Sequence, residues 1–223
     1  MKGILFDLDG VLVDVSESYN LTIKMVVERL AGRMVSDGDI EAYRSRGGLN
    51  NDWDLTECII KEAGVPADRT TLVALFQKIY RGKNFGGLIR KETPLVHADT
   101  LRALRKTRSL GIVTGRPRDE ADFTLRRFRL APEFSVLVTM DELPPGRGKP
   151  DPLGIRLALD SLGLREAVYV GDTVDDMQAA RSAGLPAVGI VRGPCLREER
   201  IKALKTWGAS AVLADVNDIL EVL

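Results

Sequence analysis

Short apolar runs alternate with amphipathic segments over much of the chain. From Pro94 onward, segments with apolar residues at helical spacing alternate with continuous apolar runs. Continuous apolar runs are typical of parallel strands that are buried on both faces. The predicted strands are 109–114, 134–139, 167–170, 187–191 and 211–213, and the predicted helices are 97–106, 119–128, 152–162 and 175–183. This alternation predicts an α/β fold in which helices cover both faces of a parallel sheet.

The segment before Pro94 has a different pattern. Residues 16–31 carry apolar side chains at helical spacing, and Gly32 supplies a stop signal. Residues 53–63 and 70–81 predict two further helices, and the Gly- and Asn-rich run 46–52 predicts a loop. No run typical of a strand occurs between Val15 and about Arg90. A helical insertion is therefore expected after the first strand.

Composition indicates a globular protein without a strongly charged partner. Hydrophobic residues make up 44% of the 223 residues, which suffices for a packed core. The 32 Lys and Arg residues balance the 32 Asp and Glu residues, so charge favours neither nucleic acid nor an acidic membrane. Cys58 and Cys195 lack metal-ligand spacing and suit reduced thiols. With no signal peptide or membrane span in the sequence, we expect a cytoplasmic location.

The first apolar run ends in two acids, Asp7 and Asp9, which Gly10 follows directly. Ligand chemistry in open α/β sheets lies at the carboxyl ends of the strands. Because side chains two residues apart point the same way, both carboxylates can face one centre. Two like charges at such short range are costly unless a cation joins them. The alternative is an ordinary solvated Asp-Gly turn.

Two further motifs bring polar groups to a strand end and a helix start. The predicted strand 109–114 ends at Thr114, and Gly115 lets the backbone approach a bound group. A hydroxyl and free amides there can hold phosphate oxygens, although Thr114 can also satisfy turn amides. Lys149 lies between Gly148 and Pro150, just before a helix start at 151–152. A lysine held there can reach a group of carboxylates, whereas most lysines are solvated surface charges.

A fourth motif, residues 168–177, is another apolar run that ends in acids. Asp172 falls at the strand end itself. Thr173 can cap the following helix, with Asp175 and Asp176 in its first turn, where acids favour the positive end of the helix dipole. Capping explains Asp175 and part of the role of Asp176, but it does not explain Asp172.

Together, in this order, the four motifs resemble those of the haloacid dehalogenase (HAD) superfamily, subfamily I, whose helical cap lies between the first two motifs. The resemblance covers nearly the whole chain. It implies a Rossmann-like core formed by residues 1–14 and 91–223 and a small α-helical cap formed by residues 15–90. The expected hinges are 14–16 and 89–94.

The resemblance also implies roles for individual residues. Asp7 would be the nucleophile that forms an aspartyl phosphate, and Asp9 the general acid and base. Mg²⁺ would be bound by Asp7, the backbone carbonyl of Asp9, and Asp172. The phosphoryl oxygens would be held by Thr114 and Lys149, with the backbone amides of Leu8, Asp9 and Gly115. Asp176 would orient Lys149 or a metal-bound water.

These roles imply a Mg²⁺-dependent phosphatase of a small phosphorylated metabolite. The acid at Asp9 argues against carbon–halogen cleavage, because dehalogenases of the superfamily generally lack it. A phosphomutase of the β-phosphoglucomutase type and a non-catalytic protein with this fold are the alternatives. Substrate choice is expected to depend on the polar cap loop near Arg44, Arg46 and Asn50, and on Arg116 beside Thr114, although the cap loop can also be a plain connection between helices.

Overall fold

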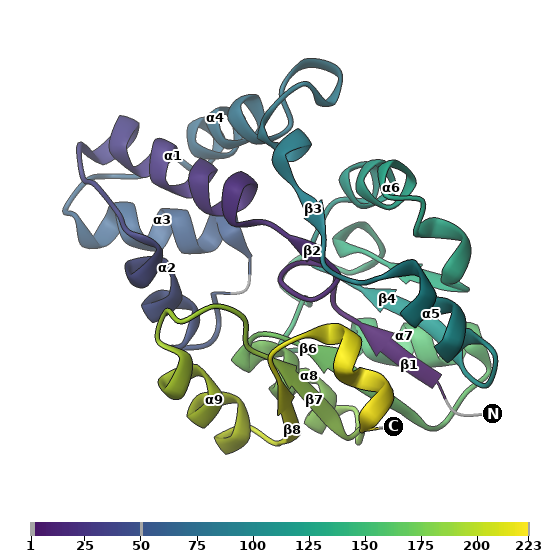
Figure 1. The fold of residues 1–223 in the computed structure, drawn as a ribbon. Helices are drawn as coiled ribbons and strands as arrows, with labels where there is room; N and C mark the ends of the chain where they lie inside the picture. Colours follow the sequence, from purple (N-terminus) through teal and green to yellow (C-terminus); the bar gives the residue numbers. More distant parts are fainter. Residues whose placement is uncertain (1–2, 50, 223) are drawn as a thin grey trace.

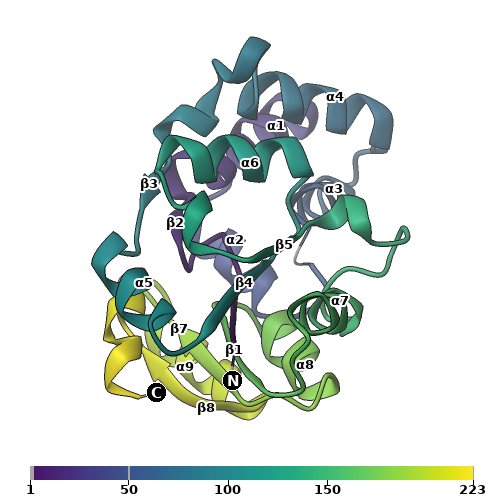
Figure 2. The same ribbon diagram turned by 90° about the vertical axis from the view of Figure 1, so that its right-hand side faces the viewer.

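The computed structural model describes residues 3–49 and 51–222, and its centre is a six-stranded parallel sheet (Figures 1 and 2). The strand order is β5-β4-β1-β6-β7-β8. The bounds are β1 Gly3–Phe6, β4 Ser109–Val113, β5 Val136–Val138, β6 Ala167–Gly171, β7 Ala187–Ile190 and β8 Ala209–Leu213. The predicted α/β fold with a parallel sheet is confirmed.

The register of the central strands places the predicted site residues along one edge of the sheet. Phe6, the last residue of β1, lies opposite Ile112 of β4 and Val170 of β6. The three strands therefore end at the same level, and the residues that follow them emerge together. This edge is the carboxyl end, where open α/β sheets bind ligands.

Helices cover both faces of the sheet. Because side chains alternate along β1, neighbouring residues of this strand belong to two different buried clusters. Leu5 belongs to a buried cluster with Ile155 of α7 and Met177 of α8, whereas Phe6 packs in a cluster with Leu101 of α5. The helices that follow the cap are α5 Ala98–Arg105, α6 Arg118–Arg127, α7 Leu153–Leu162, α8 Val174–Ser182 and α9 Arg197–Thr206.

In the described part of the predicted cap there are four α-helices, which Figure 1 shows beside the sheet. They are α1 Leu21–Ala31, α2 Asp37–Arg44, α3 Asp52–Glu62 and α4 Arg69–Tyr80. Two short antiparallel strands, β2 Val13–Asp14 and β3 Thr93–Pro94, pair where the chain enters and leaves the cap. Within the described residues, no helix is long and apolar enough to cross a membrane.

The observed helices differ from the predicted ones in three places. Residues Ser16–Asn20 form a π-helical turn before α1, and Gly32 ends α1 with a left-handed φ of 64°. The sequence did not predict α2, which begins with a capping box between Ser36 and Asp39, nor α9. The remaining short segments are 3₁₀ turns at Lys83–Phe85, Leu88–Lys91, Ala131–Glu133, Met140–Glu142 and Val216–Glu221.

Candidate active site

Asp7 and Lys149 form the centre of the site. Asp7 follows β1 directly, and its backbone N–H donates to Val170 O of β6 at 2.8 Å. Its side chain is buried, and Lys149 Nζ lies 2.9 Å from Asp7 Oδ1. Lys149 extends from the loop before α7, which begins where Asp151 Oδ1 accepts a hydrogen bond from Leu153 N–H at 2.9 Å. The lysine is therefore fixed just outside a helix start.

Asp176 combines a helix cap with a charge pair. Its backbone N–H donates to Thr173 Oγ1 at 3.2 Å, and its Oδ2 accepts from Thr173 N–H at 3.0 Å. The other carboxylate oxygen, Oδ1, lies 2.7 Å from Lys149 Nζ and accepts from the Tyr169 hydroxyl at 3.2 Å. The start of α8 and the contact with Lys149 thus use different oxygens of one carboxylate.

Three carboxylates meet beside Lys149. One oxygen from each of Asp7, Asp172 and Asp176 lies within 4.8 Å of the others. Burial raises the pKa of Asp7 to about 7; Lys149 opposes this rise, and Asp176 and Asp9 add to it. Burial, with the charges of Asp176 and Asp7, raises the pKa of Asp172 well above its usual range. An oxygen donor set whose charges repel one another fits a hard divalent cation, so this cluster could hold one.

The loop after Asp9 passes very close to Asp172. Gly10 adopts a φ of 71°, and a Cβ at this position would lie 2.1 Å from Asp172 Oδ2. Any other residue would be strained at this φ, and its Cβ would displace the Asp172 carboxylate. Arg200 of α9 lies on another side, with its Nη2 4.0 Å from Asp172 Oδ2 and its Nε 3.1 Å from Glu41 Oε2 of the cap. Asp172 is thereby enclosed by both the core and the cap.

The Asp9 carboxylate contacts Arg116. Arg116 Nε lies 2.8 Å and 3.1 Å from the two Asp9 carboxylate oxygens, and Arg116 Nη2 also contacts Oδ1. The Arg116 side chain is 1% exposed, whereas that of Asp9 is 27% exposed. Burial opposes the positive charge, but Asp9, Tyr80 and Glu92 outweigh it and keep the pKa of Arg116 well above its usual value. The guanidinium is therefore permanently charged.

Thr114 and Leu8 lie beside these groups. The Thr114 backbone N–H donates to Val138 O at 2.9 Å, and its Oγ1 accepts from Arg116 N–H at 3.2 Å. The bond from Arg116 N–H is a turn hydrogen bond, which is the alternative role that the sequence allows for the Thr114 hydroxyl. The Leu8 side chain is fully buried in the core, as its position between two outward-pointing acids predicts.

Several clefts open at this edge of the sheet, and two of them contain Gly115. The first is lined by core residues Asp7, Asp9, Gly10, Gly115, Arg116 and Asp172 and by cap residues Arg44, Asn51, Asp52 and Trp53. The second is lined by Thr114, Gly115 and Lys149 together with Trp53, Arg69 and apolar residues of 140–145. Core and cap therefore share both clefts, and Gly115 lies where they meet.

The predicted cap residues have different positions. Arg44 lines the first cleft, with its Nη2 2.9 Å from Asp52 Oδ1. Arg46 is half-exposed, lies 3.0 Å from Glu62 Oε1, and covers the Tyr43 ring at 4.2 Å. Asn50 lies outside the described residues. Of the two described arginines of the cap loop, Arg44 is the one that faces the predicted catalytic acids.

Several residues that contact the site were not predicted from the sequence, among them Tyr169, Arg200 and Glu92. Tyr169 bonds to Asp176, Arg200 lies near Asp172, and Glu92 binds the Arg116 guanidinium, with Arg116 Nη1 3.1 Å from Glu92 Oε2. Glu92 lies in the connection from cap to core, and it shares no motif with Arg116. The alternation of side chains along β6 offers a partial signal for Tyr169, but none marks Glu92 or Arg200.

A buried acid also joins core and cap near the first cleft. Glu120 of α6 is 1% exposed, and its Oε2 accepts a hydrogen bond from the Tyr19 hydroxyl at 2.9 Å. The Tyr19 ring stacks on Tyr80 with centroids 4.0 Å apart. Burial raises the pKa of Glu120 to about 7; hydrogen bonds and the charge of Arg116 oppose the rise without cancelling it.

Glu120 should make the stability of the protein fall as pH rises. Its folded pKa of about 7 exceeds the usual value of 4.5, so the folded state holds this proton more tightly between those pH values. The free energy of unfolding should therefore fall by about 3 kcal/mol in total from below pH 4.5 to above pH 7. In Glu120→Gln this part of the fall should disappear, which urea unfolding at a series of pH values measures.

Asp122→Asn is the matched control, because Asp122 is a partly exposed acid on the same helix that pairs with Arg126 at 3.9 Å. That variant should keep the wild-type slope of unfolding free energy against pH. A Glu120→Gln variant with the wild-type slope would show that Glu120 is already ionised in the folded protein near pH 5.

Comparison with known proteins identifies the family. The haloacid dehalogenase-like hydrolase family matches residues 1–184. An imidazoleglycerol-phosphate dehydratase from Phytophthora nicotianae is 34% identical over 230 residues, which are 96% of this chain but only 50% of that longer protein. A phosphoglycolate phosphatase from Escherichia coli O157:H7 is 27% identical over 240 residues, 100% of this chain and 92% of the relative.

Solved structures agree with these relatives. A proposed β-phosphoglucomutase from Thermotoga maritima superposes with a TM-score of 0.69 at 25% identity, over 100% of this chain and 98% of that one. The four motifs, the strand order and the family match all support the same family. The chain belongs to the haloacid dehalogenase-like hydrolases, with the predicted Rossmann-like core.

Proposed function

We propose that the protein is a Mg²⁺-dependent phosphatase of a small phosphorylated metabolite and that Asp7 forms an aspartyl phosphate. The observation that carries this proposal is the position of Lys149 Nζ, 2.9 Å from Asp7 Oδ1, at a strand end where Asp7, Asp172 and Asp176 converge. Phosphoryl transfer needs a nucleophile, charge compensation and little else. The similarity to phosphoglycolate phosphatase supports the same reaction class.

In the first step, an Asp7 carboxylate oxygen attacks phosphorus while the bond from phosphorus to the leaving oxygen breaks. Asp9 gives its proton to that oxygen, and the alcohol leaves. Lys149 and Thr114 hold the phosphoryl oxygens, and the backbone amide of Gly115 adds a donor. Donors fixed in a buried site stabilise the developing charge without having to reorganise.

In the second step, Asp9, now a carboxylate, takes a proton from water. The water oxygen attacks phosphorus, the bond from phosphorus to Asp7 breaks, and inorganic phosphate leaves. Asp7 returns as a carboxylate and Asp9 as an acid, so the proton count balances over the cycle. Asp176 holds the Lys149 ammonium in place through both steps, since its Oδ1 lies 2.7 Å from Nζ.

The donor set fits Mg²⁺. Carboxylates of Asp7 and Asp172 and the backbone carbonyl of Asp9 would hold it, because Mg²⁺ favours oxygen ligands and retains several waters. When bound, the ion compensates negative charge on the phosphoryl group and on the carboxylates. Burial raises the pKa of Asp7 to about 7, so the protein by itself leaves this nucleophile only partly ionised at neutral pH.

A phosphomutase of the β-phosphoglucomutase type is the second candidate, favoured by the similarity to the Thermotoga maritima structure. Both reactions use an aspartyl phosphate, but a mutase transfers the phosphoryl group to a sugar and needs a bisphosphate. A non-catalytic role is disfavoured, because Asp7, Lys149 and Asp176 retain a geometry that a scaffold does not need.

A screen of phosphorylated metabolites with Mg²⁺ or EDTA tests the proposal. We expect release of inorganic phosphate from at least one small ester, phosphoglycolate being the first to try, and a loss of at least about 100-fold when EDTA removes the metal. Mg²⁺ should also raise the melting temperature of the wild type, since it binds the folded site.

The outcomes separate the candidates. Isomerisation of a hexose phosphate that depends on a bisphosphate, with no net phosphate release, would indicate the mutase. Hydrolysis that continues unchanged in EDTA would exclude the metal site. A lack of turnover for every ester, together with a melting temperature that Mg²⁺ does not shift, would favour the non-catalytic protein.

A further inference from the structure

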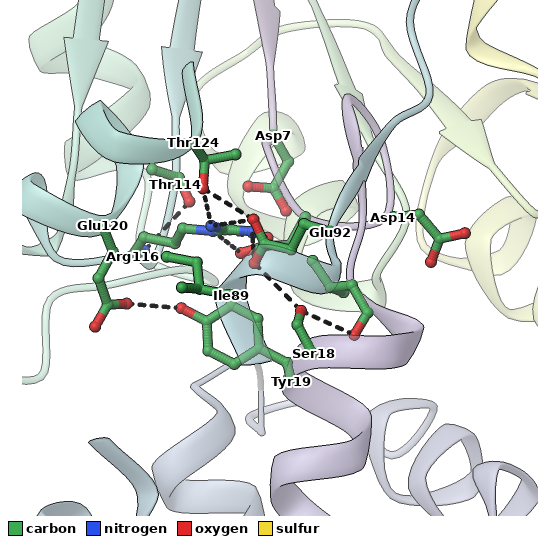
Figure 3. A network of polar contacts seen from close by, with 12 residues as sticks. Asp7, Asp14, Ser18, Tyr19, Ile89, Glu92, Thr114, Arg116, Glu120 and Thr124 are labelled. Carbon is green, nitrogen blue, oxygen red and sulfur yellow. Dashed lines mark hydrogen bonds and ion pairs between the residues drawn. The ribbon is translucent and has the colours of Figure 1, made fainter. Parts of the chain in front are cut away.

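Arg116 carries a fully buried charge that is bound on several sides at once (Figure 3). Its Nε and Nη2 contact the Asp9 carboxylate. Its Nη1 lies 3.1 Å from Glu92 Oε2, 3.0 Å from the Tyr80 hydroxyl and 3.0 Å from Thr124 Oγ1, and its Nη2 lies 3.1 Å from Glu92 Oε1. The guanidinium is engaged in every direction in which it can donate.

Glu92 forms the opposite side of this network. It is 1% exposed and accepts hydrogen bonds from the Tyr80 hydroxyl at 2.8 Å, from Thr124 Oγ1 at 2.8 Å and from Ser18 Oγ at 3.2 Å. Glu92 therefore fixes Arg116 from behind, while Arg116 presents its other edge to Asp9. An arginine placed between two carboxylates with satisfied hydrogen bonds has little freedom to turn.

The network draws on several separate segments. Asp9 follows β1, Thr124 lies on α6 of the core, and Tyr80 ends α4 of the cap. Ser18 and Glu92 lie on the two connections between core and cap, and Figure 3 shows them together with Arg116. The position of the Asp9 carboxylate is thus linked to the position of both connections.

We propose that Arg116 is a positioning residue: it holds the Asp9 carboxylate in the orientation needed for proton transfer, and Glu92 and Tyr80 hold Arg116. This inference rests on the proposed function, in which Asp9 is the general acid and base. A proton donor must lie within hydrogen-bond distance of the leaving oxygen, and a displacement of about 1 Å can cost roughly 100-fold in rate. The planar, two-pronged guanidinium fixes a carboxylate in a way that an ammonium does not.

Arg116→Lys tests this role, because lysine keeps the charge but cannot bind Asp9 and Glu92 together. The readout is the rate of alcohol or phenol release in the first turnover, for two substrates. For phosphoglycolate, or the alkyl ester hydrolysed fastest in the screen, the rate should fall by roughly 100-fold with little change in KM. For p-nitrophenyl phosphate, whose leaving group needs almost no proton, it should fall by less than about 5-fold.

Asp9→Asn completes the experiment as a double-mutant cycle. If Arg116 acts through Asp9, adding Arg116→Lys to Asp9→Asn should change the alkyl-ester rate by less than about 3-fold. If the rate losses of the two single variants multiply in the double variant, or if both substrates lose rate equally, Arg116 has only a structural role. A raised KM with unchanged kcat would instead make it a substrate-binding residue.

Tyr80→Phe keeps the inference testable if Arg116→Lys does not fold. It removes the hydroxyl that contacts Arg116 Nη1 and Glu92 Oε1 but keeps the ring that stacks on Tyr19. We expect a smaller loss in first-turnover rate, of roughly 10-fold, for the alkyl ester only. An equal loss relative to the wild type for both esters would contradict the inference. If Asp9→Asn itself has no effect, the proposed function fails, whereas an effect of Asp9→Asn without one of Arg116→Lys removes this inference alone.

Discussion

Replacing Asp7 with Asn should lower phosphate release by at least roughly 10⁴-fold, because the amide cannot attack phosphorus and no aspartyl phosphate forms. The variant should remain folded. Burial raises the pKa of Asp7 to about 7, so the ionised side chain is costly to bury, and a neutral amide of the same shape removes that cost. In EDTA at pH 8, the urea midpoint of Asp7→Asn should equal or exceed that of the wild type, which separates lost chemistry from lost structure.

Asp14→Asn is the matched control. Asp14 lies in the same N-terminal segment and pairs with Arg192 at 3.3 Å, so the chemical change is identical but falls outside the acid cluster. Its kcat and KM should stay within about 3-fold of the wild type. In the wild type, a covalent phosphoryl adduct trapped during turnover should map to Asp7. Phosphate release by Asp7→Asn at more than a few per cent of the wild-type rate would assign the nucleophile elsewhere.

The sheet and the centre of the site could be predicted from the sequence because their signals are local. A buried parallel strand is a continuous apolar run, and an acid that follows such a run must lie at the carboxyl edge. Asp7 and Asp172 are both placed by this rule, and the level ends of β1 and β6 bring them together. Lys149 follows from its place between glycine and proline ahead of α7.

Other parts of the molecule had no local signal. In α9 the fully buried side chain is Leu204, and the rest of its sequence is dominated by charge, so no apolar stripe marked the helix. The network around Arg116 joins residues 107 and 24 positions apart, and each of its members looks alone like an ordinary surface or loop residue. Such contacts arise only when the cap connections fold against the core.

Arg116 shows how burial changes the interpretation of a residue. The sequence places it two residues after Thr114, beside a predicted phosphate site, where an arginine suggests contact with an anionic substrate. In the structure its guanidinium already contacts Asp9 and Glu92, both within 3.1 Å. A substrate anion would have to displace a carboxylate that is itself bound in a buried network. Its position in the chain predicts a place near the site, and its contacts with Asp9 and Glu92 favour a positioning role over contact with substrate.

Replacing Lys149 with Met should impair both stability and catalysis. The Lys149 side chain is 4% exposed, and its ammonium lies 2.9 Å from Asp7 Oδ1 and 2.7 Å from Asp176 Oδ1, so its loss leaves buried carboxylates uncompensated. We expect a loss of roughly 3–5 kcal/mol in the free energy of unfolding at pH 8 in EDTA. Burial works against the Lys149 charge, but Asp176 and Asp7 raise its pKa well above the usual value, so this stabilisation is fully present at neutral pH. The kcat should fall by about 10²–10³-fold, because a donor to the phosphoryl oxygens is missing.

The destabilisation should shrink as pH is lowered from 8 to 6. The pKa of Asp7 is about 7 with Lys149 present and rises further once this ammonium is lost, and a protonated Asp7 no longer needs a cationic partner. Arg147→Met is the matched control: Arg147 lies two residues earlier in the same loop and pairs with Asp151 at 2.5 Å on the surface, so its loss should change neither stability nor kcat appreciably. Urea unfolding of both variants at the two pH values measures the difference. A Lys149→Met variant as stable as Arg147→Met at pH 8 would show that water or a shift of α7 compensates the acids, so that Lys149 does not stabilise the folded site.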